Sequence, residues 1–147
     1  MSNHERGRKL MAAALEYLGE MDAAIARGSW NIAVRHAQEV VELVMKAVLG
    51  YLCIDYPKVH DTADVFIAAL GRRQMGLSDD EAADVRAVSS RLAEKRAPAF
   101  YFEYDEDAKV ARAAAEDARR IHRLCTRLVN TIAERERQDE SHTSDAE

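Results

Sequence analysis

The sequence predicts an all-α fold, an antiparallel bundle of four long helices plus a short one. The chain has 147 residues, 48% of them hydrophobic and 32% charged, which suits one compact domain with a sizeable core. Its six glycines and two prolines are too few to punctuate the many short strands of a sandwich or barrel. Apolar residues recur at intervals of three and four along most of the chain, which is the period of a helix.

The first two helices are predicted at about 8–26 and 29–52. Gly28 ends the first helix, and Ser29 is a residue type suited to cap the second. The second helix has an unusually broad apolar stripe, so we expect it to lie at the centre of the bundle. It ends near Pro57, because a proline disfavours helix at the residue before it.

Three further helices complete the bundle. A short one is predicted over about 62–73. The fourth begins near Asp79, after the Ser78-x-x-Glu81 pattern of a capping box, and is expected to stop where Pro98 interrupts it. The fifth is predicted over about 106–135, with acidic residues at its positive end. Residues 1–135 are thus expected to form a single domain.

The net charge of −5 is unevenly placed along the chain. The last fourteen residues contain two bases and six acids, a net charge of −4, which leaves −1 for residues 1–133; the acids are Glu134, Glu136, Asp139, Glu140, Asp145 and Glu147. We expect residues 136–147 to form an acidic, disordered tail, because they are polar and lack periodicity. A nearly neutral body with local basic clusters permits a small phosphate site and argues against broad, sequence-independent nucleic-acid binding.

The chain is expected to be cytoplasmic. No stretch approaches the apolar length of a membrane helix, and the first residues do not resemble a signal peptide. Cys53 and Cys125 are too few for a disulfide framework and lack the spacing of a zinc site, so we interpret both as reduced, packed thiols.

Polar residues of the predicted second helix fall on one narrow strip, which contains Arg35, Glu39, Glu42 and Lys46. Glu42 and Lys46 are four residues apart with the acid first, the favourable order for an ion pair on a helix surface. On spacing alone the strip is an ordinary solvated face. His60 follows in a turn, where it either caps the third helix or binds a ligand.

The segment from Arg96 to Tyr101 is the most informative short stretch. An arginine can hold a phosphate through two hydrogen bonds while a tyrosine stacks or hydrogen-bonds, a combination suited to a nucleotide or an RNA backbone. The structural alternative is that the aromatic residues of 100–104 pack over the end of the bundle and Arg96 caps helix carbonyl groups.

Other chemistry is weakly indicated. Four arginines of the predicted last helix form a basic ridge, Arg112, Arg119, Arg123 and Arg127, but nearby acids favour a solvated face. The single, reversed pattern His36-x-x-Glu39 is not that of a bundle di-iron site, so neither metal nor cofactor is expected. No phosphate-binding glycine loop or nucleophile motif is present.

The order of four stretches resembles the HEPN family, helical-bundle proteins named for nucleotide binding in higher eukaryotes and prokaryotes. The second stretch is similar to the family's Ala-Gln-x-x-x-Glu-x-x-x-Lys-Ala-x-Leu helix, and together the four span about residues 8–130. They are Gly28–Ala33, Ala37–Leu49, Pro57–Asp61, and Arg96–Tyr101 followed by Glu106–Ala108.

The resemblance implies a helical bundle that is commonly dimeric and often paired with a minimal nucleotidyltransferase in a toxin–antitoxin system. Many members are metal-independent ribonucleases whose motif is an arginine followed after four to six residues by histidine. Here Arg96 is followed by Tyr101, and no histidine lies between Arg96 and His122. A tyrosine, with an ordinary pKa near 10, is a poor proton-transfer group at neutral pH.

The resemblance groups Glu42, Lys46, His60, Arg96 and Tyr101 as one expected nucleotide or RNA site. The expected function is binding of a nucleotide or RNA together with a partner such as a minimal nucleotidyltransferase, without strong catalysis. The first alternative is a metal-independent endoribonuclease toxin that uses Arg96 and Tyr101. The second is a structural module that forms a homodimer through the second helix and residues 100–104.

Overall fold

The computed structural model describes residues 2–55, 62–101 and 106–146, with the side chains of 96–101 left aside. These residues form five helices: α1 (Asn3–Ala26), α2 (Trp30–Tyr51), α3 (Ala63–Arg72), α4 (Asp79–Tyr101) and α5 (Ala108–Asp145). The all-α bundle of four long helices and one short helix is therefore confirmed. None of the described helices combines the length and apolar character that a membrane span requires.

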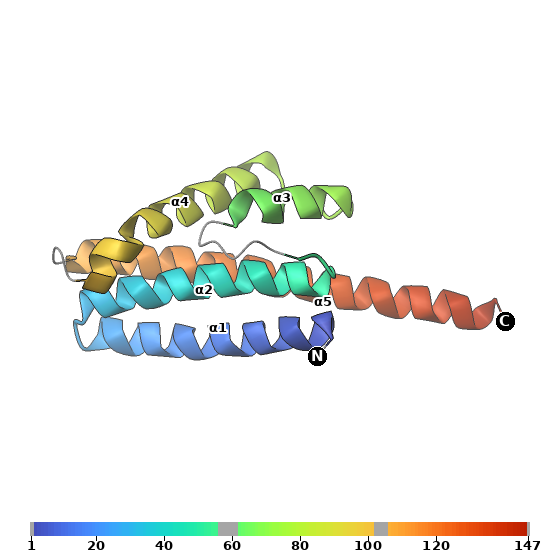
Figure 1. Cartoon of the computed structure of the whole chain (residues 1–147), viewed down its shortest axis with the longest axis horizontal. Helices are drawn as coiled ribbons and strands as arrows, with labels where there is room; N and C mark the ends of the chain where they lie inside the picture. Colours follow the sequence, from blue (N-terminus) through green and yellow to red (C-terminus); the bar gives the residue numbers. More distant parts are fainter. Residues whose placement is uncertain (1, 56–61, 102–105, 147) are drawn as a thin grey trace.

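Helix α2 is the centre of the bundle, as its broad apolar stripe predicts. It packs against all four other helices, with α1 along one side, α5 behind it and the α3–α4 pair above (Figure 1). The largest fully buried side chains come from all five of these helices and include Met21, Met45, Phe66, Leu70, Val88 and Ile121. Burial of these apolar side chains is the main stabilising term of the fold.

Helices α1 and α2 approach closely at two glycines. A Cβ added to Gly7 would lie 2.8 Å from Cδ2 of Tyr51, and one added to Gly50 would lie 3.3 Å from the carbonyl oxygen of Asn3. The connection between these helices turns at Gly28, whose φ of 74° is a conformation that favours glycine. The predicted end of the first helix at Gly28 is thus explained by backbone geometry.

The capping box predicted at the start of α4 is present. The backbone N–H of Glu81 donates to Oγ of Ser78 at 3.1 Å, and the backbone N–H of Ser78 donates to Oε1 of Glu81 at the same distance. The predicted interruption at Pro98 is wrong, because α4 remains helical to Tyr101. Proline costs roughly 3 kcal/mol inside a helix, but packing against neighbouring elements can outweigh this penalty.

Helix α5 is also longer than predicted, since its end was expected near residue 135. It continues to Asp145 and projects beyond the bundle, so residues 136–145 are helical (Figure 1). The side chains of 137–145 are all exposed. This stretch has no glycine or proline, which are the strongest helix breakers.

Candidate functional site

Four charged side chains form a strip along one face of α2: Arg35, Glu39, Glu42 and Lys46. We call this the α2 polar strip. On one edge of it, Nε2 of Gln38 donates to the carbonyl oxygen of Leu92 in α4 at 2.6 Å. On the other edge, His36 contacts Tyr17 and Glu20 of α1. The helical period places the strip between these two edges, on the side of α2 between α1 and α4.

All four side chains of the α2 polar strip are half-buried, and all interact with neighbouring groups. Nζ of Lys46 donates to Oε1 of Glu42 at 2.7 Å, and each of these side chains is only 13% exposed. The predicted pair is therefore formed, but it is less solvated than an ordinary surface pair. Burying charge is costly unless it is paired, so this arrangement is weak evidence for stability alone.

A second polar cluster joins α2 and α4 to the residues just before α5: Asn31, Lys95 and Glu106. Oδ1 of Asn31 accepts a 2.8 Å hydrogen bond from the backbone N–H of Glu106, and Nζ of Lys95 lies 3.2 Å from Oε1 of Glu106. The Glu106 side chain is only 4% exposed. The sequence indicated no role for Asn31 and placed Glu106 only among the acids at the positive end of the fifth helix, although both lie in stretches that carry the family resemblance.

Of the five residues expected to form the site, the structure describes the side chains of Glu42 and Lys46. It places the backbone of Arg96 and Tyr101 in the last turns of α4, while their side chains and all of His60 lie outside the described residues. Because α4 runs roughly antiparallel to α2 and Leu92 lies opposite Gln38, the helical rise puts the backbones of Arg96 and Lys46 about 18 Å apart along the bundle.

His36 of α2 makes contacts with α1 that the sequence did not predict. Its Nε2 lies 3.5 Å from Oε2 of Glu20, its ring centre is 5.5 Å from that of Tyr17, and its buried Nδ1 has no hydrogen-bond partner. Burial lowers the pKa of His36, and nearby Glu20 only partly offsets this effect. His36 and Glu39 form no metal cluster, and no other group among the described residues does so.

The arginines of the predicted basic ridge connect α5 to neighbouring helices through ion pairs and a contact with an aromatic ring. The guanidinium of Arg112 lies 5.2 Å from the ring centre of Trp30, and Nη2 of Arg119 lies 2.6 Å from Oδ1 of Asp22. Arg127 pairs with Glu81 of α4 at 2.7 Å. Three of the four ridge arginines are therefore engaged between helices instead of forming the simple solvated face that we expected.

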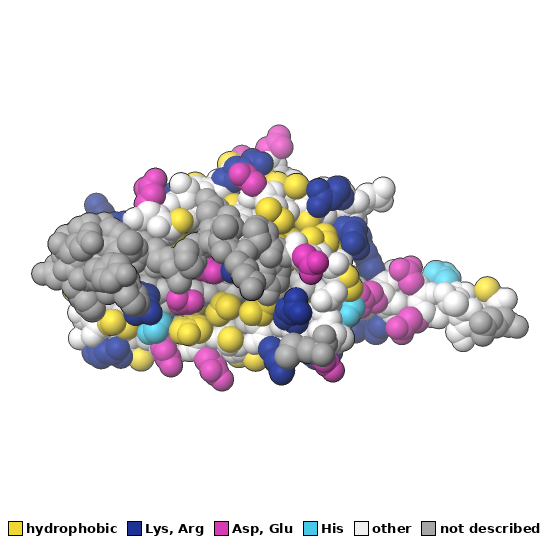
Figure 2. All heavy atoms as spheres, viewed as in Figure 1, with side chains coloured by type: hydrophobic (Ala, Val, Ile, Leu, Met, Phe, Trp, Pro, Cys, Tyr) yellow, Lys and Arg dark blue, Asp and Glu magenta, His cyan; other side chains and the backbone are white. Residues whose placement is uncertain are grey.

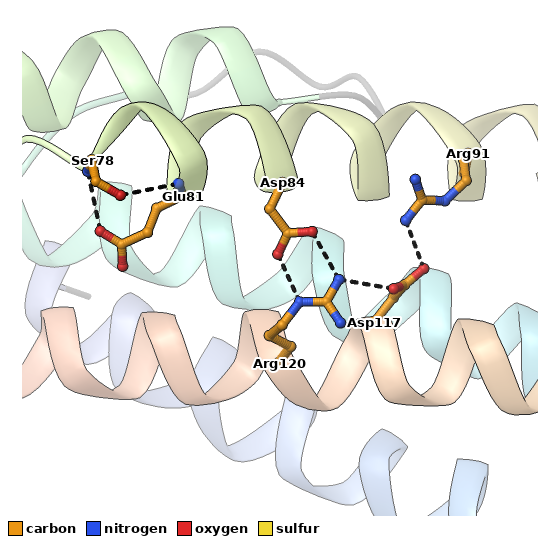
Figure 3. A network of polar contacts seen from close by, with 6 residues as sticks. All are labelled: Ser78, Glu81, Asp84, Arg91, Asp117 and Arg120. Atoms are coloured by element: carbon orange, nitrogen blue, oxygen red, sulfur yellow. Dashed lines mark hydrogen bonds and ion pairs between the residues drawn. The ribbon is translucent and has the colours of Figure 1, made fainter.

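Acids and bases alternate along the α4–α5 seam. Arg120 of α5 bonds both Asp84 and Asp117, and Arg91 reaches the same Asp117 carboxylate from α4 (Figure 3). On the face shown in Figure 2, lysine and arginine side chains are likewise scattered among acidic ones. Among the described residues of this seam and face, acids thus interrupt the bases, which does not favour broad, sequence-independent nucleic-acid binding there.

A comparison with known protein families shows to which family the chain belongs. The model of the HEPN domain matches residues 8–128, from the first turns of α1 to Leu128 of α5. The chain belongs to the HEPN domain family. This HEPN domain is accordingly a helical domain of a nucleotide- and RNA-related family, and the resemblance read from its motifs is confirmed. No curated protein and no solved structure matched the chain.

The family match includes the α2 polar strip, the cluster at Asn31 and the segment from Arg96 to Tyr101. It stops before the projecting end of α5, which begins after the last core residue, Ile132. The α2 polar strip and the cluster of Asn31, Lys95 and Glu106 therefore both belong to the HEPN domain itself.

Proposed function

We propose that this HEPN domain binds a nucleotide or a short stretch of RNA at the α2 polar strip and acts with a partner protein. The observation that carries the proposal is the Glu42–Lys46 pair, 2.7 Å apart and 13% exposed, on the helix that otherwise forms the core. A charged strip on the central helix adds little to stability, which favours a binding role.

In this proposal Lys46 and Arg96 contact phosphate, Tyr101 stacks on a base or donates a hydrogen bond, and Glu42 orients the cations. His60 supplies a further polar contact. The axial separation of about 18 Å between the backbones of Lys46 and Arg96 suits a ligand with two or more phosphates, such as a nucleoside polyphosphate or an RNA segment. Without the motif histidine the site binds its ligand and lacks strong catalysis.

Binding measurements test this proposal. Titration calorimetry measures the binding of nucleoside triphosphates, and fluorescence anisotropy measures that of labelled RNA oligonucleotides. We expect Lys46→Met and Arg96→Ala each to weaken binding at least tenfold. Lys109→Met, which removes the same charge from an exposed position on α5, should leave affinity within twofold. Unchanged binding in both site variants would reject the proposed site.

The ribonuclease alternative has a direct test of its own. The purified protein is incubated with transfer RNA and messenger RNA in the presence of a chelator, beside Arg96→Ala and Tyr101→Phe. Cleavage that disappears in Arg96→Ala would replace the binding proposal with a metal-independent endoribonuclease. Intact RNA, together with binding, would support the proposal.

The proposed partner is a minimal nucleotidyltransferase, and we further propose that the domain forms a homodimer in the cytoplasm. A small nucleotidyltransferase encoded beside this chain, and its co-purification with the chain, would support a two-component toxin–antitoxin role. A domain that neither binds RNA or nucleotides nor acts on RNA, but is dimeric, would match the structural alternative.

A further inference from the structure

We infer that the outer face of α1 is an interface for a second copy of the chain, with the two α1 helices antiparallel and crossing near Leu15. Leu15 is 61% exposed and is the only large hydrophobic side chain so exposed in the described parts of the chain. Met11 and Leu18, one turn to either side, are themselves only partly buried against the core. The three side chains make a continuous apolar edge on α1.

The residues next to this edge are small and exposed: Ala12, Gly19, Ala23 and Ala26. A glycine inside a helix costs about 1 kcal/mol relative to alanine, and no heavy atom lies within 4 Å of a Cβ built on Gly19. Packing within the chain therefore gives no reason for this glycine. A second helix approaching closely would use the space that Gly19 and Ala12 leave.

The charges of α1 are complementary to themselves in the antiparallel arrangement. The first half carries the bases Arg6, Arg8 and Lys9, with Glu5, whereas Glu16, Glu20 and Asp22 follow in the second half. About a twofold axis at Leu15, Arg8 of one copy lies level with Asp22 of the other, and Lys9 with residues 20–21. A parallel arrangement would set like charges against each other.

The acids remain available to a second copy. Asp22 pairs with Arg119 at 2.6 Å but is still 52% exposed, and Glu20 lies 3.5 Å from His36 with 63% exposure. Both acids lie on the borders of the small-residue face. A second copy would complete their charge pairing and cover Leu15, so the occupant is another molecule of this chain.

This surface differs from the one in the structural alternative, which involves the second helix and residues 100–104. It also lies on another side of the bundle from the α2 polar strip, so the inference does not depend on the proposed ligand.

Sedimentation velocity from about 1 to 100 µM tests the inference. We expect a concentration-dependent dimer in the native chain and at least a tenfold weaker association in Leu15→Arg. Because Leu15 is mostly exposed, this variant should keep its helical circular dichroism. Ala83→Arg, at an exposed position of α4, is the matched control and should associate like the native chain.

A cross-link tests the twofold axis itself. In a Cys53→Ser background, Leu15→Cys should form a disulfide-linked dimer under mild oxidation, whereas Ala83→Cys should not. A monomer at 100 µM, or a dimer that Leu15→Arg does not weaken and Leu15→Cys does not link, would overturn the inference. A monomeric Leu15→Arg variant that still binds RNA would support it and leave the proposed function intact.

Discussion

Arg120 of α5 and Asp84 of α4 form a bidentate salt bridge. Nε of Arg120 donates to Oδ2 of Asp84 at 2.7 Å, and Nη2 donates to Oδ1 at 2.8 Å (Figure 3). Hydrogen bonding to Arg120 holds the pKa of Asp84 below its ordinary value, and the same bond raises the pKa of Arg120. Together with the pairs Arg91–Asp117 and Arg127–Glu81, the contact joins α4 to α5.

Loss of this contact should loosen the α4–α5 seam. Both side chains are more than one-third exposed, so we expect Asp84→Ala to lower the free energy of unfolding by only about 0.5–1 kcal/mol. Urea denaturation measures the change. Double-mutant analysis with Arg120→Ala should give a coupling of the same size, and additive effects of the two substitutions would contradict a direct interaction.

Gln38 should be sensitive to charge. It is 5% exposed, and its Nε2 donates to the carbonyl oxygen of Leu92 while its Oε1 has no partner. Gln38→Glu would place a carboxylate against that carbonyl, so we expect a loss of about 2 kcal/mol or more at pH 7.

Protonation of the new carboxyl should restore part of this stability at pH 5. Gln38→Met removes the same hydrogen bond without adding charge and serves as the control. Equal stability of the two variants at pH 7 would show that charge burial at this position is unimportant.

Gly7 should not tolerate a side chain. A Cβ at this position would lie 2.8 Å from Cδ2 of Tyr51 and 3.2 Å from the carbonyl oxygen of Ala47. The tyrosine ring can move, but the helical carbonyl group cannot, so we expect Gly7→Ala to cost about 1–3 kcal/mol through overpacking. Thermal and urea unfolding measure this loss.

Gly71→Ala provides the comparison. No heavy atom lies within 4 Å of a Cβ built on Gly71, which lies in the last turn of α3. Here the substitution should stabilise the chain by up to about 1 kcal/mol, because alanine favours helix more than glycine. Destabilisation by Gly71→Ala as large as that by Gly7→Ala would contradict the packing argument.

Stability should fall as the pH drops below about 6.5. Burial lowers the pKa of both His36 and His122 below the ordinary value of 6.5. The unfolded chain therefore binds protons first as the pH falls, and the free energy of unfolding decreases between 6.5 and the lower pKa of the folded state. Above pH 6.5 this contribution to stability is fully present.

Urea denaturation at pH 7.5, 6.5 and 5.5 measures this dependence. The double variant His36→Gln/His122→Gln should show a flatter profile over that range. The lowered pKa values of Glu81 and Asp84 affect stability only in more acidic solution, as the pH falls from their ordinary values through the lowered ones. An unchanged slope in the double variant would assign the dependence to other groups.

The helical pattern predicted most of the fold because each signal is local. Gly28 ends α1, and the Ser78–Glu81 capping box starts α4, through contacts between residues at most three apart. Pro98 misled the prediction for the opposite reason. The local penalty of a proline applies inside a helix, yet α4 continues past Pro98 to Tyr101, so this penalty did not decide where the helix ends.

In the candidate site, too, contacts within one helix could be predicted and contacts between distant residues could not. The Glu42–Lys46 pair follows from a spacing of four on one helix, so it could be predicted. The contacts of Asn31 with Glu106 and of Arg119 with Asp22 join residues 75 and 97 positions apart. Their partners depend on which helices become neighbours, and periodicity does not specify that.

By itself, the sequence determined that the chain is a helical bundle, where most helices begin and end, and that α2 is central, because these properties depend on local periodicity, caps and composition. Only the tertiary structure decided that the charged strip of α2 is half-buried, that the arginines of α5 fasten neighbouring helices, and that Leu15 remains exposed on α1. Burial and pairing of a side chain depend on what packs against its helix, and that is a property of the assembled bundle.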